Sequence, residues 1–166
     1  MQVLSVIVAL WCLAGDGVSH AAKAKAKAHP PDLKILSVDS APAPFVVNER
    51  PLTLTIMVEL PKALPEEAFL NVTTLITSPS KSSIRVLETH QALTDKAVTD
   101  TAIENGTSRR IEIVQVWDGT DQTKHIVADG IYDYQVQAKL MVVSKNGPVT
   151  KETSWKKRGT LEVRTR

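Results

Sequence analysis

Apolar and polar residues alternate along two long stretches of the chain, and this alternation predicts β-strands. Between Leu52 and Leu60, every second residue is leucine, isoleucine or valine, and threonine, methionine and glutamate lie between them. From Tyr132 to Leu140, within a strand expected over 131–143, apolar residues again occupy every second position. Successive side chains of a strand point to opposite faces of a sheet. Each stretch therefore predicts a strand with one buried face and one polar face.

Shorter strand signals follow one another along the rest of the chain. Runs rich in β-branched or aromatic residues predict strands at 33–38, continued at 45–47, and at 69–77, 84–87, 110–117 and 160–164. Pro42 and Pro44 interrupt the first run, as in an edge strand that changes sheets, because proline cannot donate to a ladder. One helical turn is expected at 65–68, since proline suits a first helical position. About seven strands with almost no helical periodicity predict an all-β sandwich.

Residues 78–108 give the weakest pattern. A turn is expected at 78–83, and residues 91–107 are polar with few apolar anchors. A single helical turn near Asp95 is one alternative. Because a long loop without regular structure is unusual inside a compact domain, the segment is either a functional insertion or contains structure that the pattern does not reveal.

Two Asp-Gly motifs lie close together between the strands at 110–117 and 131–143. They are Trp117-Asp118-Gly119-Thr120-Asp121 and Asp129-Gly130-Ile131-Tyr132-Asp133-Tyr134. Glycine accepts a positive φ and aspartate can bond its own downstream backbone, so both motifs are expected to form turns. In immunoglobulin-like (Ig-like) sandwiches, a tyrosine near the start of the sixth strand bonds back to the backbone, and the residue two positions later points into the core. We assign Tyr132 to this corner and Tyr134 and Trp117 to the core.

Residues 117–134 resemble the Ig-like domain of the bacterial flagellar hook-capping (hook assembly) protein and related secreted and surface modules. That family pattern is Trp-Asp-Gly-x-Asp, a turn containing glycine, and Asp/Ser-Gly-x-Tyr-x-Tyr. The residues of this chain that match it are Trp117, Asp118, Gly119, Asp121, Asp129, Gly130, Tyr132 and Tyr134. The chain departs from the pattern where the turn glycine is expected, with Lys124 or its neighbours Thr123 and His125. The resemblance implies an Ig-like antiparallel β-sandwich and is nearly silent on function.

A flagellar role is disfavoured despite the resemblance, because the chain begins with a run typical of a secretory leader. The apolar run from Val3 to Ala14 is shorter than the about 20 residues that span a bilayer, and it suits a signal-peptide core. No lysine or arginine precedes it, so a buried first strand or a mis-assigned start is the alternative. We expect a signal peptide at 1–22, an Ala/Lys/Pro linker at 23–31 and an Ig-like domain at 32–166. The expected location is periplasmic, extracellular or on the cell surface.

Charge and cysteine content exclude some classes of protein. Without residues 1–28, which hold three lysines and one aspartate, 17 basic and 17 acidic residues remain. A nucleic-acid-binding domain is disfavoured, because it should carry a basic excess on the fold itself. Membrane contact is expected to be weak at most, through the lysines of the linker, each contributing about 1 kcal/mol near an anionic surface. Cys12 is the only cysteine, so a mature chain would use no disulfide.

Candidate chemistry is sparse. The four histidines show no metal-ligand spacing, and no nucleophile motif or phosphate-binding glycine loop is present. Asp118, Asp121 and Asp129 could converge on Ca²⁺, which prefers carboxylates and turn carbonyls, although turn formation explains them equally well. We therefore expect neither an enzyme nor a cofactor.

The sharpest surface candidate lies near the C-terminus. Trp155, Lys156, Lys157 and Arg158 place an aromatic ring among cations, a combination that could meet a glycan, peptidoglycan or an acidic partner. The favoured alternative is an edge strand or turn that lysines protect from edge pairing, with Trp155 packed on the core.

These observations predict an exported, non-catalytic Ig-like binding or structural module of the bacterial envelope or cell surface. The alternative is a periplasmic chaperone-like or carbohydrate/peptidoglycan-binding accessory protein. The expected partner is an envelope or surface protein, or a polysaccharide.

Overall fold

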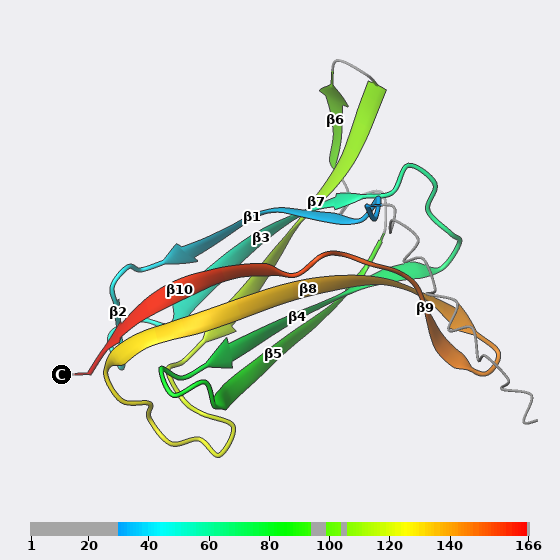
Figure 1. The fold of residues 1–166 in the computed structure, drawn as a ribbon. Helices are drawn as coiled ribbons and strands as arrows, with labels where there is room; N and C mark the ends of the chain where they lie inside the picture. The colour runs from blue at the N-terminus through cyan, green and yellow to red at the C-terminus, as the bar shows by residue number, and fades with distance from the viewer. Residues whose placement is uncertain (1–29, 94–98, 104–105, 166) are drawn as a thin grey trace, which may run out of the picture.

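The computed structural model of the chain describes residues 30–93, 99–103 and 106–165, and the regular elements within them are all strands. They form two sheets that face each other (Figure 1). The first sheet has the order β1 (Lys34–Ala41), β3 (Leu52–Leu60), β7 (Gly106–Trp117) and β6 (Thr99–Ile103). The second has the order β2 (Phe45–Val46), β10 (Lys157–Arg164), β8 (Gly130–Ser144), β4 (Ala68–Thr77) and β5 (Ser83–Ala92), with β9 (Gly147–Thr153) also paired to β8. The predicted all-β, Ig-like sandwich is confirmed.

The described residues form ten strands, where the sequence predicts about seven. The three additional strands are β2, β6 and β9. They arise because the first strand splits at its prolines, because the weakly patterned segment contributes a hairpin, and because the last edge strand divides in two along β8. All strand pairs are antiparallel except β2 with β10.

The first strand changes sheets at Pro42 and Pro44, as predicted. β1 pairs with β3 in the first sheet, whereas Phe45 of β2 pairs with Val163 of β10 in the second. The Val47 amide then donates to the Arg164 carbonyl at 2.9 Å. This crossover brings β1 and β10 side by side along one open edge of the sandwich (Figure 1).

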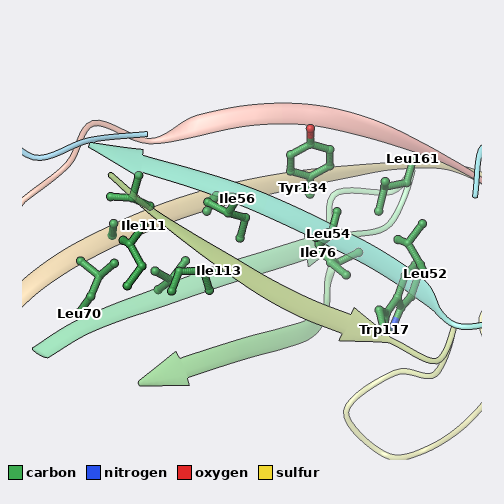
Figure 2. Packing of buried hydrophobic residues seen from close by; sticks show 14 of the residues in the cluster. Leu52, Leu54, Ile56, Leu70, Ile76, Ile111, Ile113, Trp117, Tyr134 and Leu161 are labelled. Carbon is green, nitrogen blue, oxygen red and sulfur yellow. The ribbon is translucent and has the colours of Figure 1, made fainter. Parts of the chain in front are cut away.

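The core is formed by the alternating faces that the sequence predicts. Every second side chain of β3 from Leu52 to Leu60 is at most 4% exposed. Figure 2 shows Leu52, Leu54 and Ile56 directed into the space between the sheets, with Leu70 and Ile76 of β4 and Ile111 and Ile113 of β7. Burial of this apolar surface is the main favourable term in folding.

One polar side chain lies within this core and joins the two sheets. Gln115 of β7 is 3% exposed. Its amide accepts a hydrogen bond from the Thr74 hydroxyl at 2.6 Å and donates to the Val72 carbonyl at 2.9 Å and the Thr89 hydroxyl at 3.2 Å. Because buried polar groups must be hydrogen-bonded, these contacts fix β7 relative to β4 and β5.

Outside the core, one prediction is wrong and one open alternative is decided. Residues 65–68 form no helical turn. They contain a turn at Glu66 and Glu67, with Glu67 at a φ of 53°, and lead directly into β4. In segment 78–108, the alternative of regular structure that the pattern does not reveal holds: β5 covers Ser83–Ala92, extending the strand expected at 84–87, and β6 forms a hairpin with β7 that projects beyond the sandwich (Figure 1).

Some predictions fall outside the described residues. The helical turn near Asp95 is one of these, as are the signal peptide at 1–22 and most of the linker at 23–31.

Candidate functional site

The Trp117 to Tyr134 region is architecture, as predicted. Trp117 is 1% exposed, with its ring 5.5 Å from Phe45 and 6.0 Å from Tyr132 between centroids. The Tyr132 hydroxyl donates to the Ala128 carbonyl at 2.8 Å, which confirms the tyrosine corner. Tyr134 is buried in the core. Burial raises the pKa of both tyrosines above the ordinary value.

The aspartates of this region have different roles. Asp118 accepts hydrogen bonds from the Thr120 amide at 3.0 Å and hydroxyl at 2.7 Å, and Asp121 accepts from the Thr123 amide at 2.8 Å. Both therefore bond their own downstream backbone, as predicted. Because a hydrogen bond to a carboxylate favours its charged form, the threonine hydroxyls hold the pKa of each carboxyl below its ordinary value.

Asp129 departs from this pattern. Its carboxylate accepts hydrogen bonds from the amide and hydroxyl of Thr165, at the C-terminal end of the domain. The prediction that Asp129 bonds its own downstream backbone is wrong. Asp129 instead links the start of β8 to the residue after β10. The Thr165 hydroxyl holds the pKa of the Asp129 carboxyl below the ordinary value.

The three aspartates do not converge on a cation site. Each carboxylate is bound to a different threonine, and no group of three metal-ligating side chains occurs in the described ranges. Within the same ranges, no helix is long and apolar enough to cross a membrane.

The departure from the family pattern is accommodated at Lys124. This residue has a φ of 70°, the left-handed conformation that glycine adopts at least cost. Its amide donates to the Asp121 carbonyl at 3.2 Å, and the Asp121 amide donates to the His125 carbonyl at 2.8 Å. The turn thus forms with lysine in the conformation expected of the missing glycine.

Trp155 is 68% exposed, so the prediction that it packs on the core is wrong. The preceding residue, Ser154, is buried and exchanges hydrogen bonds with Ala138 of β8. β10 begins with Lys157 paired to Val136. Trp155 and Lys156 of the edge chain therefore face a single residue of β8, Gln137. This irregularity is a β-bulge. The bulge turns Trp155 outward and shifts the alternation by one position before β10.

Trp155 borders a groove of about 500 Å³ between the start of β1 and the β9–β10 junction. The residues that line it are Pro30, Pro31, Leu33, Lys34, Ile35, Leu36, Trp155, Lys156, Lys157 and Arg158. We call this the β1–β10 groove. All four predicted partner-binding residues lie in it.

Two contacts fix the walls of the β1–β10 groove. The Glu152 carboxylate of β9 accepts hydrogen bonds from the Asp32 amide at 2.5 Å and the Leu33 amide at 3.0 Å. The Lys157 ammonium donates to the Leu36 carbonyl at 2.5 Å. One hydrogen-bond donor of the Lys157 ammonium is therefore used to hold β1 beside β10.

The polar side chains of the groove are all cationic. Lys34 lies 3.8 Å from the Glu59 carboxylate, outside the lining, and the Arg158 Nε donates to Gln135 at 3.2 Å. Lys156 is exposed and makes no ion pair or side-chain hydrogen bond with any residue that the structure describes. Ammonium and guanidinium groups are hydrogen-bond donors only. The groove thus combines an apolar floor with donors that favour a ligand rich in acceptors.

Sequence reasoning missed one wall of this site. Pro30 and Pro31 were assigned to a linker and Leu33 to Leu36 to a strand, with no indication that they face Trp155. The isolated aromatic residue among cations was the only available signal, and it identifies the opposite wall.

No known family model matches the chain, and no curated protein matches it. Among solved structures, it is similar to the alkylpurine DNA glycosylase AlkC of Pseudomonas fluorescens, bound to DNA containing an abasic site analogue. That similarity has a TM-score of 0.39 and 13% identity, and it covers 81% of this chain but 31% of that chain. The chain is also similar to AggA, the major subunit of aggregative adherence fimbriae type I from Escherichia coli, with a TM-score of 0.32 and 12% identity over 83% of this chain and 98% of that one. At these TM-scores and identities, neither similarity bears on function.

Proposed function

We propose that the protein is an exported, non-catalytic Ig-like module of the bacterial envelope or cell surface that binds a partner at the β1–β10 groove. The observation that carries this proposal is the 68% exposure of Trp155 beside Lys156, at the mouth of a groove with an apolar floor. Tryptophan and arginine are the side chains most enriched at energetic centres of interfaces. An envelope or surface protein is the partner class that we favour.

A partner that covers the exposed indole of Trp155 removes apolar surface from water, which stabilises the complex. A tryptophan side chain buries about 150–250 Å² when it is fully covered. Covering the exposed part of Trp155 would therefore contribute about 3 kcal/mol at about 25 cal/mol per Å². The bulge at this position turns the ring away from the core. The unbound domain therefore lacks the hydrophobic stabilisation that burial of this ring would give.

We also propose that the domain is related to the Ig-like domain of the flagellar hook-capping protein. The Tyr132 corner supports this relationship, as does the left-handed conformation of Lys124 where that family has glycine. The relationship concerns the fold, and the proposed function does not depend on it.

A periplasmic chaperone-like role is a second candidate, because two strand edges beside the groove have no ladder partner among the residues that the structure describes. Within that part of the chain, β1 pairs with β3 on one side alone, and β10 meets β2 at Val163 and Arg164. A carbohydrate- or peptidoglycan-binding role is favoured by Trp155 alone. Retention of the protein on insoluble peptidoglycan, lost in Trp155→Ala, would support that third role over both others.

Site-specific photo-crosslinking in producing cells tests the proposed function. A photoreactive side chain at position 156 should give a discrete adduct with an envelope component, since Lys156 lies in the groove and is exposed. The same probe at position 151 is the matched control, because Lys151 is an exposed lysine of β9 outside the groove lining. Identical adducts from both positions, or none from 156, would contradict binding at this groove.

Export is tested separately by sequencing the N-terminus of the protein in the envelope fraction. Cleavage near residue 22 is expected from the apolar run and the small residues that follow it. An intact Met1 in that fraction would contradict a cleaved signal peptide.

A further inference from the structure

We infer that the occupant of the β1–β10 groove is an extended acidic segment of a partner protein that carries at least one large apolar side chain. This inference rests on the proposed function, because it names the chemistry of the partner at the same site.

The charge of the groove favours an acidic partner. Four of the residues that line the groove are cationic and none is acidic. Two carboxylates lie close to the lining but outside it: that of Glu59, 3.8 Å from the Lys34 ammonium, and that of Glu152, which accepts from the Leu33 amide at 3.0 Å. A partner with carboxylates is attracted to this positive surface, and a basic partner is repelled.

The hydrogen-bonding groups of the lining side chains favour a ligand that brings acceptors. Its polar side chains are all donors, and the remaining side chains are apolar. A neutral sugar presents hydroxyl groups that need acceptors as well as donors, and in this lining only main-chain carbonyls could accept. A segment with carboxylates and main-chain carbonyls brings acceptors for Lys156 and for Arg158, whose Nε already donates to Gln135.

The position of the groove between two strand edges favours an extended peptide. The groove runs between two strand edges, β1 and the start of β10, whose main chains have no ladder partner on the facing sides among the described residues, although the Leu36 carbonyl accepts from the Lys157 ammonium. Unpaired strand edges pair with extended peptides, and pockets beside the edge receive alternate side chains. Leu36 and Trp155 offer an apolar surface to one such side chain, while the neighbouring side chains of the same segment meet the cations.

The groove is also concave, which favours a peptide over a lipid surface. An interfacial anchor buries a protruding apolar face in the bilayer boundary. Here the apolar side chains Leu33, Ile35 and Leu36 form part of a hollow and are buried or half-buried. A single inserted side chain reaches them more readily than a bilayer does.

Fluorescence supplies the test in the exported protein, from which Trp11 is expected to be cleaved, because Trp155 is exposed and Trp117 is 1% exposed. The probe is a short peptide in which glutamates alternate with leucine and threonine. It should protect Trp155 from acrylamide quenching, whereas a counterpart with lysine in place of glutamate should not. Lys156→Glu should weaken binding at least about fivefold, since it replaces an attraction by a repulsion. Trp155→Ala, followed by anisotropy of a labelled peptide, should weaken binding by at least about tenfold.

Matched controls separate the groove from the rest of the surface. Lys151→Glu makes the same charge change outside the groove lining, and Ile131→Ala removes another exposed apolar side chain, 64% exposed on β8. Both should bind the acidic peptide within about twofold of the unsubstituted protein. These four side chains are exposed, so the variants should fold normally.

Three outcomes would overturn the inference. These are equal binding of the acidic and the lysine peptide, no binding of either peptide, and binding of polygalacturonate or phosphatidylglycerol vesicles, dependent on Trp155 and Lys156, in place of the acidic peptide. If the cross-link from position 156 persists in any of these cases, the proposed function stands and only the partner chemistry is wrong. If that cross-link is absent, the proposed function itself fails.

Discussion

The ring of Tyr134 lies against the bare backbone of Gly159 across the β8–β10 ladder, in the space that a Cβ at position 159 would occupy. An added Cβ would overlap the hydroxyl and the adjacent ring atoms of Tyr134. Gly159 is therefore required by the packing of a neighbour rather than by a turn. An aromatic ring over a strand glycine also covers backbone that would otherwise be open.

Gly159→Ala should lower the free energy of unfolding by about 1–3 kcal/mol, since overpacking forces side chains and backbone to shift. Urea denaturation followed by circular dichroism measures this effect. Thr160→Ala, at the next and exposed position of β10, should change the free energy by less than about 0.5 kcal/mol. A Gly159→Ala protein as stable as the original would show that Tyr134 can move aside freely.

Lys124 and Gly119 should respond in opposite directions to substitution. Lys124→Gly should stabilise the domain by about 0.5–1 kcal/mol, because glycine removes the strain of a φ of 70° at some cost in unfolded-state entropy. Lys124→Ala keeps that strain and should be near neutral. Thermal and urea unfolding of both variants provide the comparison, and a destabilising Lys124→Gly would contradict strain at this turn.

Gly119→Ala should destabilise the domain by at least about 1–2 kcal/mol. Its φ is 79°, and a Cβ there would lie 2.9 Å from the Val47 side chain. The same unfolding measurements apply, with Lys124→Ala as the control for a substitution elsewhere in the loop. Equal stability of the two variants would show that Val47 yields to the added methyl group.

Acid should weaken the domain through its turn aspartates. The Thr120 hydroxyl holds the pKa of Asp118 below its ordinary value of 3.8, and Thr123 and Thr165 act in the same way on Asp121 and Asp129. A group whose pKa is lowered on folding stabilises the protein above its unfolded pKa and loses that contribution as pH falls toward its folded pKa. The urea midpoint should therefore decrease between about pH 5 and about pH 3.

Asp118→Asn tests the contribution of one of these groups. The amide oxygen can still accept from Thr120, but it does not titrate, so the decrease in the urea midpoint over the same pH interval should be smaller. Thr120→Ala removes the strongest cause of the lowered pKa and should flatten the dependence in the same way. An unchanged pH profile in both variants would remove Asp118 from this account.

The buried contact between Gln115 and Thr74 should show strong coupling. Thr74→Val leaves the Gln115 Oε1 without its 2.6 Å partner and should cost about 1–3 kcal/mol. Gln115→Leu combined with Thr74→Val should cost less than the sum of the two single substitutions, because an apolar pair leaves fewer orphaned polar groups. A double-mutant cycle from urea denaturation measures the coupling, and strictly additive losses would contradict it.

Much of the core could be predicted because it depends on local alternation. The buried face of β3 from Leu52 to Leu60 and the inward residues of β8, such as Tyr132 and Tyr134, follow directly from their positions in the sequence. The edge strand β5 was underestimated. Its residues are exposed or half-buried throughout, so hydrophobic alternation is weak where only one neighbouring strand supports it.

The candidate site, like the core, could be predicted only in part from the sequence. The cations and Trp155 could be selected from the sequence, but their orientation could not. Trp155 follows buried Ser154, and either residue could have pointed inward until the register with Ala138 and Val136 was known. A bulge changes the parity of every later residue in the strand, and nothing in the local sequence marks it.

The sequence by itself determined the central strands such as β3 and β8, the Asp118-Gly119 turn and the tyrosine corner, because each depends on backbone sterics and side-chain parity over a few residues. Only the tertiary structure decided that Pro30 to Leu36 face Trp155 across a groove. The physical reason is that this arrangement depends on which strands pair, and in what register, between residues more than a hundred positions apart, as for Leu36 and Lys157. Pairing of that kind is set by the packing of the whole sandwich rather than by local preference.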